Sequence, residues 1–158
     1  MSEATIESNN QELAGLCFVH LVTSPAIAGG PTLNLYLTID TVNKNVRGSA
    51  VVSQALAEPI VNTSHVEGNF FYESTMVDSA IRIDLDGFPE VHFPPFGGPG
   101  PALMKNFTAT IVMDTELNEG TVRFQYVNNR TGQWVNPGQQ TIHRAPVAIA
   151  DQAEQAAA

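Results

Sequence analysis

The sequence predicts an all-β domain: an antiparallel meander of about eight strands closed as a β-barrel, with a β-sandwich as the alternative. Three observations favour this fold. Short runs that alternate apolar and polar residues, typical of half-buried strands, recur along the chain. No stretch between residues 15 and 143 keeps the 3.6-residue apolar period of a helix for ten residues. Small residues such as Gly48, Ala50 and Gly68 fall at candidate interior positions, where glycine often marks a barrel corner.

The first half of the chain supplies four runs of this kind. The expected strands are 15–24, 32–40, 46–55 and 64–75. The first, "GLCFVHLVTS", is almost continuously apolar and suits a central strand. In the second, "TLNLYLTID", four aliphatic residues share one face and Tyr36 lies on the opposite, polar face. In the fourth, Phe70 and Tyr72 are expected on the same inner face.

The second half continues the meander. The expected strands are 80–86, 106–114 and 121–127, followed by "QWVN" (133–136) and "QTIHR" (140–144). The tripeptide "NEG" at 118–120 predicts a tight turn between two of them. We expect the last two runs to pair with each other around Pro137 and Gly138.

Length and composition predict a single domain with two arms. At 158 residues and 43% hydrophobic content the chain can bury one core. The expected parts are a polar N-terminal arm (1–12), one β domain (13–143) and an Ala-rich C-terminal tail (144–158).

The net charge of −9 argues against two classes of partner. Nucleic acids and anionic membrane surfaces both require clustered lysine and arginine, and the chain has seven basic residues against sixteen acidic ones. No run approaches the ~20 apolar residues of a membrane-spanning helix. We therefore expect neither nucleic acid nor membrane as a partner.

The N-terminal residues and the cysteine content indicate the compartment. The start of the chain has neither the basic stretch nor the apolar core of a secretory signal. The single cysteine, Cys17, forms no internal disulfide. We expect a cytoplasmic protein, or one exported without a cleavable signal peptide. The three sequons at Asn62, Asn106 and Asn129 are accordingly interpreted as chance.

The histidines and acids form few chemical constellations. None of the four histidines has metal-ligand spacing, so we expect no metal and no cofactor. His20 lies in an apolar run that suits a core or interface histidine, and His65 shares a strand face with Glu67. The best candidate for acid–base chemistry is the pair Glu90 and His92, two residues apart in "PEVHF".

Residues 87–103, "GFPEVHFPPFGGPGPAL", hold half of the ten prolines. Proline fixes φ and donates no hydrogen bond, so this segment cannot pair fully in a sheet. It also carries Phe88, Phe93 and Phe96. These rings either cap one end of the barrel or offer an apolar contact to a ligand or a second chain.

Three stretches resemble an uncharacterised family of small bacterial β-domains. They are "PTLNLYLTIDTVNKNVRGSAVVSQA" (31–55), "SHVEGNFFYESTM" (64–76) and the segment 87–103, within a likeness that covers about residues 15–128. The resemblance implies a bacterial source and a shared scaffold. It implies no activity and no catalytic residue.

Three functions fit these features. The first is a non-enzymatic structural or interaction module that assembles with itself as a homo-oligomer or filament, using outer strand faces such as that of Tyr36. The second is a lipocalin-like binder of a small apolar ligand inside the barrel. The third is a cofactor-free barrel isomerase or cyclase that uses Glu90 and His92.

Overall fold

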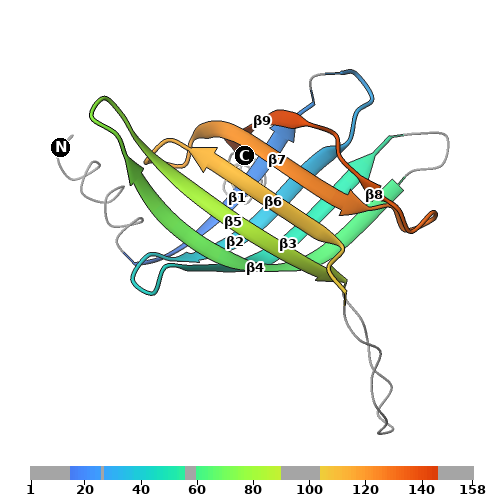
Figure 1. The fold of residues 1–158 in the computed structure, drawn as a ribbon, viewed down its shortest axis with the longest axis horizontal. Helices are drawn as coiled ribbons and strands as arrows, with labels where there is room; N and C mark the ends of the chain where they lie inside the picture. Colours follow the sequence, from blue (N-terminus) through green and yellow to red (C-terminus); the bar gives the residue numbers. More distant parts are fainter. Residues whose placement is uncertain (1–14, 26, 56–59, 90–103, 146–158) are drawn as a thin grey trace, which may run out of the picture.

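The computed structural model describes residues 15–25, 27–55, 60–89 and 104–145, and within them all regular structure is β-strand (Figure 1). The strands are β1 (Leu16–Ser24), β2 (Thr32–Asp40), β3 (Asn45–Gln54), β4 (Ile60–Ser74), β5 (Ser79–Pro89), β6 (Phe107–Met113), β7 (Glu119–Val127), β8 (Trp134–Val135) and β9 (Gln139–Arg144). The described residues contain no helix of the length and apolarity that a membrane crossing requires. The expected arm at 1–12 and the tail from residue 146 onward lie outside the described residues.

Eight of these strands close into an antiparallel barrel. Each strand from β1 to β6 pairs with the next one along the chain. The strand β9 then pairs with β7 on one side and with β1 on the other. Leu21 of β1, for example, lies between Leu35 of β2 and Arg144 of β9. The ring is complete, so the predicted barrel is confirmed and the sandwich alternative is not.

The prediction for the last two runs was wrong. The strands β8 and β9 do not pair with each other, because both lie along the same side of β7. In the pairing of β7 with β8, Val135 lies opposite Tyr126. If β9 continued in the same register, Gly138 would lie opposite Arg123, but the residue found there is Gln139. One extra residue is therefore inserted between β8 and β9, at the point where Pro137 has no N–H to donate.

Two differences concern β4. It begins at Ile60, four residues before the expected start. The start was not predicted because the inward-facing residues there, Asn62 and Ser64, are polar, so the sequence shows no apolar alternation at this point. At its other end Tyr72 is half exposed, whereas Phe70 is fully buried. The pairing of β4 with β3 stops at Asn69, so Tyr72 belongs to a hairpin that extends beyond the barrel wall.

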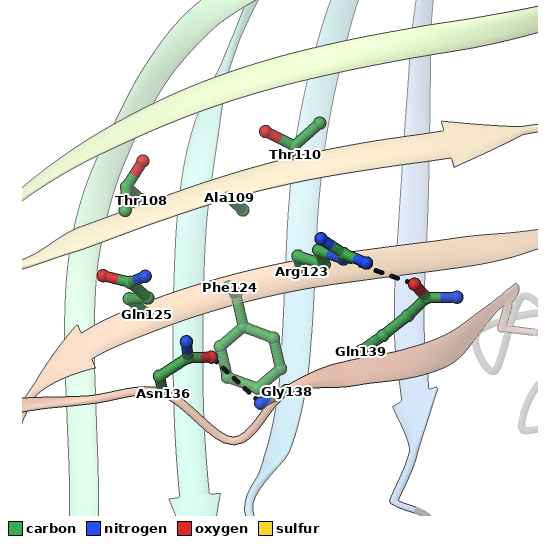
Figure 2. A pocket seen from close by; sticks show the side chains of 9 residues that line it. All are labelled: Thr108, Ala109, Thr110, Arg123, Phe124, Gln125, Asn136, Gly138 and Gln139. Atoms are coloured by element: carbon green, nitrogen blue, oxygen red, sulfur yellow. Dashed lines mark hydrogen bonds between the residues drawn. The ribbon is translucent and has the colours of Figure 1, made fainter.

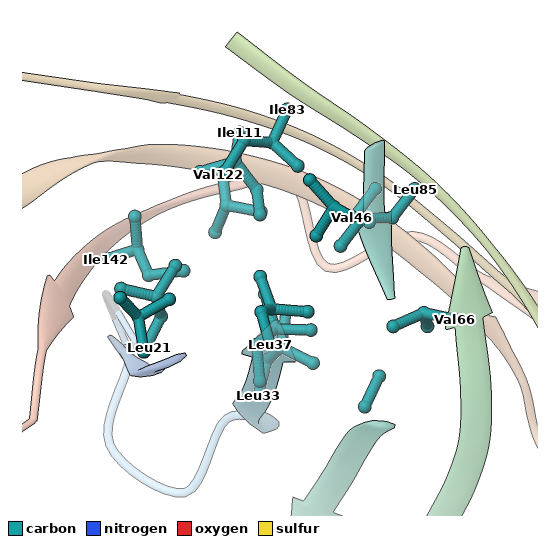
Figure 3. Close-up of a cluster of buried hydrophobic side chains, with 14 of the residues drawn as sticks. Leu21, Leu33, Leu37, Val46, Val66, Ile83, Leu85, Ile111, Val122 and Ile142 are labelled. Carbon is teal, nitrogen blue, oxygen red and sulfur yellow. The ribbon is translucent and has the colours of Figure 1, made fainter. Parts of the chain in front are cut away.

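Alternate residues of every barrel strand face inward and fill the interior (Figure 3). The expected inner faces of 32–40, 80–86, 106–114 and 121–127 are buried as predicted. The largest buried side chains are Tyr126, Phe70, Phe107 and Phe124. A barrel of eight strands is just wide enough to be filled by side chains, and the buried rings occupy that space here.

Glycine allows neighbouring strands to approach closely at two corners. A Cβ atom on Gly48 would meet the backbone carbonyl of Tyr36, and one on Gly68 would meet that of Asp84. Any side chain at these positions would push β3 away from β2, or β4 away from β5. This is the role that the sequence predicts for glycine in a barrel wall.

The two ends of the barrel differ. One end, on the right in Figure 1, holds the longer described connections: residues 25–31 join β1 to β2, and residues 128–138, which include β8, join β7 to β9. Those at the other end are short turns at 41–44, 75–78 and 114–118. The buried polar residues lie at the end with long connections; they are Thr23, Asn62, Ser64, Asn106 and Gln140.

Candidate functional site

The predicted site residues fall into two groups. Tyr36 and Phe88 are described by the structure, whereas Glu90, His92, Phe93 and Phe96 lie outside the described residues. Phe88 follows the inward-facing Gly87 in β5, so its half-buried ring lies on the outer surface. There it lines a groove with Glu67 and Asp86. Phe88 therefore does not cap the barrel interior.

Tyr36 and Phe88 lie in one row of outward-facing residues. The strand register places five side chains side by side across β1 to β5; they are His20, Tyr36, Ser49, His65 and Phe88. At the usual strand spacing of about 4.8 Å, Tyr36 and Phe88 are about 14 Å apart. The structure thus brings two predicted residues to one surface, but not into contact.

His20 is held against Tyr36 on this surface. Its ring stacks on the Tyr36 ring with 4.4 Å between centroids and 18° between planes. Its Nε2 atom donates to Oδ1 of Asn34 over 2.9 Å, since an amide oxygen only accepts. The sequence suggested a core or interface histidine, and the structure places His20 on the outer face in a fixed orientation.

His65 forms a more exposed pair with Glu67. Its Nε2 lies 3.4 Å from Oε1 of Glu67, and both side chains are more than half exposed. A pair in water contributes little stability. The neighbouring strand β5 carries the stronger ion pairs, because Arg82 contacts both Asp84 and Glu73. The hydrogen bonds that Arg82 donates to the Asp84 carboxylate are the chief reason why the pKa of Arg82 lies above its usual value.

Formal charge is distributed unevenly around the barrel. The strands β1 to β3 carry only Asp40 and Arg47, both near the end with short turns. On this weakly charged side Leu16 is 62% exposed, Phe18 is 73% exposed and Tyr36 is 50% exposed. The register places Leu16 and Phe18 beside Asp40 and Thr38, so these apolar side chains gather along β1 and β2. We call this surface, the outward-facing residues of β1 to β3, the neutral face.

A separate groove lies on the other side of the barrel (Figure 2). Its volume is about 420 Å³, and it runs over the outer faces of β6 and β7 beside the segment that joins β8 to β9. The lining residues are Thr108, Ala109, Thr110, Arg123, Phe124, Gln125, Asn136, Gly138 and Gln139. Sequence reasoning missed this groove, because β8 and β9 were expected to pair with each other rather than with β7.

Two sequon asparagines prove to be part of the interior. Asn62 is fully buried and its Nδ2 donates to the carbonyl oxygen of Val127 over 2.6 Å. The Ser64 hydroxyl lies 2.9 Å from Oδ1 of Asn62 and 2.8 Å from Oδ1 of Asn106. A glycan on either asparagine would have to displace this network, which agrees with the interpretation of these two sequons as chance.

The described residues contain no cluster of three or more His, Cys, Asp or Glu side chains placed to hold a metal ion. Among the tyrosines, burial raises the pKa of Tyr126 above its ordinary value, because a dry interior disfavours the phenolate.

Comparison with protein-family models identifies a family for this chain. A family model with the description "Domain of unknown function (DUF1842)" matches residues 14–134, which span the wall from β1 to the start of β8. No curated protein matches the chain. The match assigns neither an activity nor a site residue.

Proposed function

Because the chain belongs to the DUF1842 family, whose function is unknown, membership assigns it no activity, and we propose from the fold that it is a non-enzymatic module that associates with copies of itself. The contact surface in this proposal is the neutral face. The observation that carries it is the gathering of exposed Leu16, Phe18 and Tyr36 on strands that hold almost no charge.

Electrostatics favours a second copy at this face. Two copies of a chain with net charge −9 repel each other, and the repulsion is strongest where acidic surfaces meet. The strands β4 and β5 carry Glu67, Glu73, Asp84 and Asp86, so contact there would bring like charges together. Contact through the neutral face keeps these carboxylates in water and covers the exposed rings.

The geometry favours a closed dimer. Each of the eight barrel strands already pairs with two neighbours, so contact through side-chain faces requires no free strand edge. A single self-complementary patch generates a two-fold dimer, in which Phe18 of each copy meets the same surface of the other. An open filament would need a second patch that complements the first.

The other two functions have less support. An apolar ligand inside the barrel would have to displace rings such as Phe70 and Phe124, which are fully buried. An isomerase or cyclase would depend on Glu90 and His92, which lie outside the described residues. Self-association uses only side chains that the structure describes.

Sedimentation velocity over a wide range of protein concentration tests the proposal. We expect the wild-type chain to form a dimer and Phe18→Asp to weaken that dimer roughly tenfold or more, because it places a carboxylate in an apolar contact. Met76→Asp is the matched control: it adds the same charge at a fully exposed apolar residue in the turn between β4 and β5, outside the neutral face. It should leave the dimer unchanged.

Circular dichroism should show the same β-structure in all three proteins, because Phe18 faces away from the core. A wild-type chain that stays monomeric at its solubility limit would overturn the proposal. So would a Phe18→Asp variant that dimerises as tightly as the wild type.

A further inference from the structure

We infer that the groove over β6 and β7 binds a small hydroxylated carboxylate, with Arg123 holding the carboxylate group. This inference does not depend on the proposed self-association. In the ring of eight strands, β6 lies four positions from β2, so the groove and the neutral face are on opposite sides of the barrel.

The floor of the groove is set by the register of two strands. Thr108 lies opposite Gln125, and Thr110 lies opposite Arg123, so four polar side chains form a compact outward-facing patch. The side wall is the segment from Asn136 to Gln139. Gly138 has φ +85°, which lets the chain turn sharply there, and its N–H donates to Oδ1 of Asn136 over 3.0 Å.

The hydrogen bonds within the groove occupy the side-chain oxygen atoms of two amide residues and leave N–H donors for a ligand. The Nε atom of Arg123 donates to Oε1 of Gln139 over 3.3 Å, which occupies the oxygen of that amide (Figure 2). The oxygen of Asn136 is likewise occupied by the Gly138 N–H, so its NH₂ group is left for a ligand. The groove therefore offers N–H donors more than acceptors, which is the chemistry that an anion requires.

Arg123 has no acidic partner among the described residues, and none of the described residues that line the groove is acidic. Arg82 is different, because Asp84 and Glu73 hold its guanidinium on both sides. In a chain with sixteen acidic residues and seven basic ones, an arginine without a carboxylate partner in a polar groove is conspicuous. A ligand carboxylate would supply the missing partner.

The lining indicates the class of ligand. The planar guanidinium fork matches the two oxygens of a carboxylate. The hydroxyl of Thr110 and the side-chain amides of Gln125 and Asn136 match hydroxyl groups on the rest of the molecule. The volume of about 420 Å³ lies within the range of small-molecule sites. A sugar acid or a hydroxy acid has this combination of groups.

Titration with glucuronate, followed by amide chemical shifts in NMR spectra of the full chain, tests the inference. We expect shifts at Thr110, Gln125 and Asn136, and weaker or no binding of glucose, which has the same ring size without the carboxylate. Inorganic phosphate should also bind more weakly, because it lacks the hydroxylated carbon chain that would contact Thr110, Gln125 and Asn136 while the anion contacts Arg123.

Substitutions then assign the role of Arg123. Arg123→Gln should weaken glucuronate binding about tenfold or more, because it removes a charge-assisted hydrogen bond. Arg123→Lys keeps the charge and should bind less tightly than the wild type. The matched control is Arg47→Gln, which removes the same charge from the opposite wall and should change binding less than about twofold.

Three results would overturn the inference. They are no binding of glucuronate to the wild type, equal binding of glucose, or unchanged binding in a folded Arg123→Gln variant. Equal or tighter binding of phosphate would overturn the carboxylate assignment in favour of a general anion site. Thermal unfolding of each variant shows whether it is folded, and since Arg123 is an exposed residue its loss should leave the barrel intact.

Discussion

Replacing Gly68 with alanine would place a methyl group against the backbone of β5. The new Cβ would meet the carbonyl oxygen of Asp84, at 2.7 Å from its carbonyl carbon and 3.0 Å from Cα of Leu85. All three atoms belong to the backbone, so no side-chain rotation relieves the contact. The strand β5 must move, which disturbs its pairing with β4 at the position where Gly68 faces Leu85.

The expected cost can be estimated from three contributions. Overpacking a well-filled site costs about 1–3 kcal/mol. Weakening one or two ladder hydrogen bonds adds about 1 kcal/mol each. Alanine also lowers the conformational entropy of the unfolded chain relative to glycine, which offsets about 0.4–1 kcal/mol of this loss. We therefore expect Gly68→Ala to lower the free energy of unfolding by about 3 kcal/mol.

Urea unfolding followed by circular dichroism measures this difference. The matched control is Gly15→Ala, because a Cβ on Gly15 meets no atom within 4 Å. It should change stability by less than about 0.5 kcal/mol. If the free energy of unfolding of Gly68→Ala lies within about 1 kcal/mol of the wild-type value, the corner has room for a side chain, and close approach of β4 and β5 does not require glycine there.

Two further predictions concern buried polar groups. Asn62→Ala should cost about 2–3 kcal/mol in urea unfolding, because it removes the side-chain donor to the Val127 carbonyl and leaves the Ser64 hydroxyl with Asn106 as its remaining acceptor. The exposed Asn69→Ala is the control and should be near neutral. Tyr126→Phe should alter the pH dependence of stability. Burial raises the pKa of folded Tyr126, so its contribution is complete below the unfolded value of 10.0 and is lost as pH rises beyond it. Unfolding at neutral and alkaline pH should show a smaller alkaline loss in Tyr126→Phe, and an equal loss would refute this assignment.

The alternation of apolar residues was enough to predict most of the wall. It located β2, β5, β6 and β7 and assigned their inner faces, because a half-buried strand imposes a period of two on its own sequence. It failed where the inward-facing residues are polar, as at Asn62 and Ser64 at the start of β4. A hydrophobic pattern contains no signal for a buried polar network.

The surfaces were harder to predict, because they depend on which strands become neighbours. Tyr36 and Phe88 were chosen separately, and only the register across four strands shows that they share a row. The groove at Arg123 is bordered by the one-residue insertion between β8 and β9. From the sequence, the turn residues at this point predicted a hairpin between the two strands instead. Nothing near Arg123 in the sequence indicates that Asn136 forms the wall beside it.

Closure of the ring has a consequence for the order in which the fold can form. The contact between Leu21 and Arg144 joins β1 to β9, the first and last of the described strands, so a ribosome must release almost the whole barrel sequence before the barrel can close. Until then β1 and β7 each lack the neighbour that β9 provides. Such long-range pairing is typical of slow folding, and it makes the nascent chain a candidate for chaperone protection until its C-terminal strand emerges.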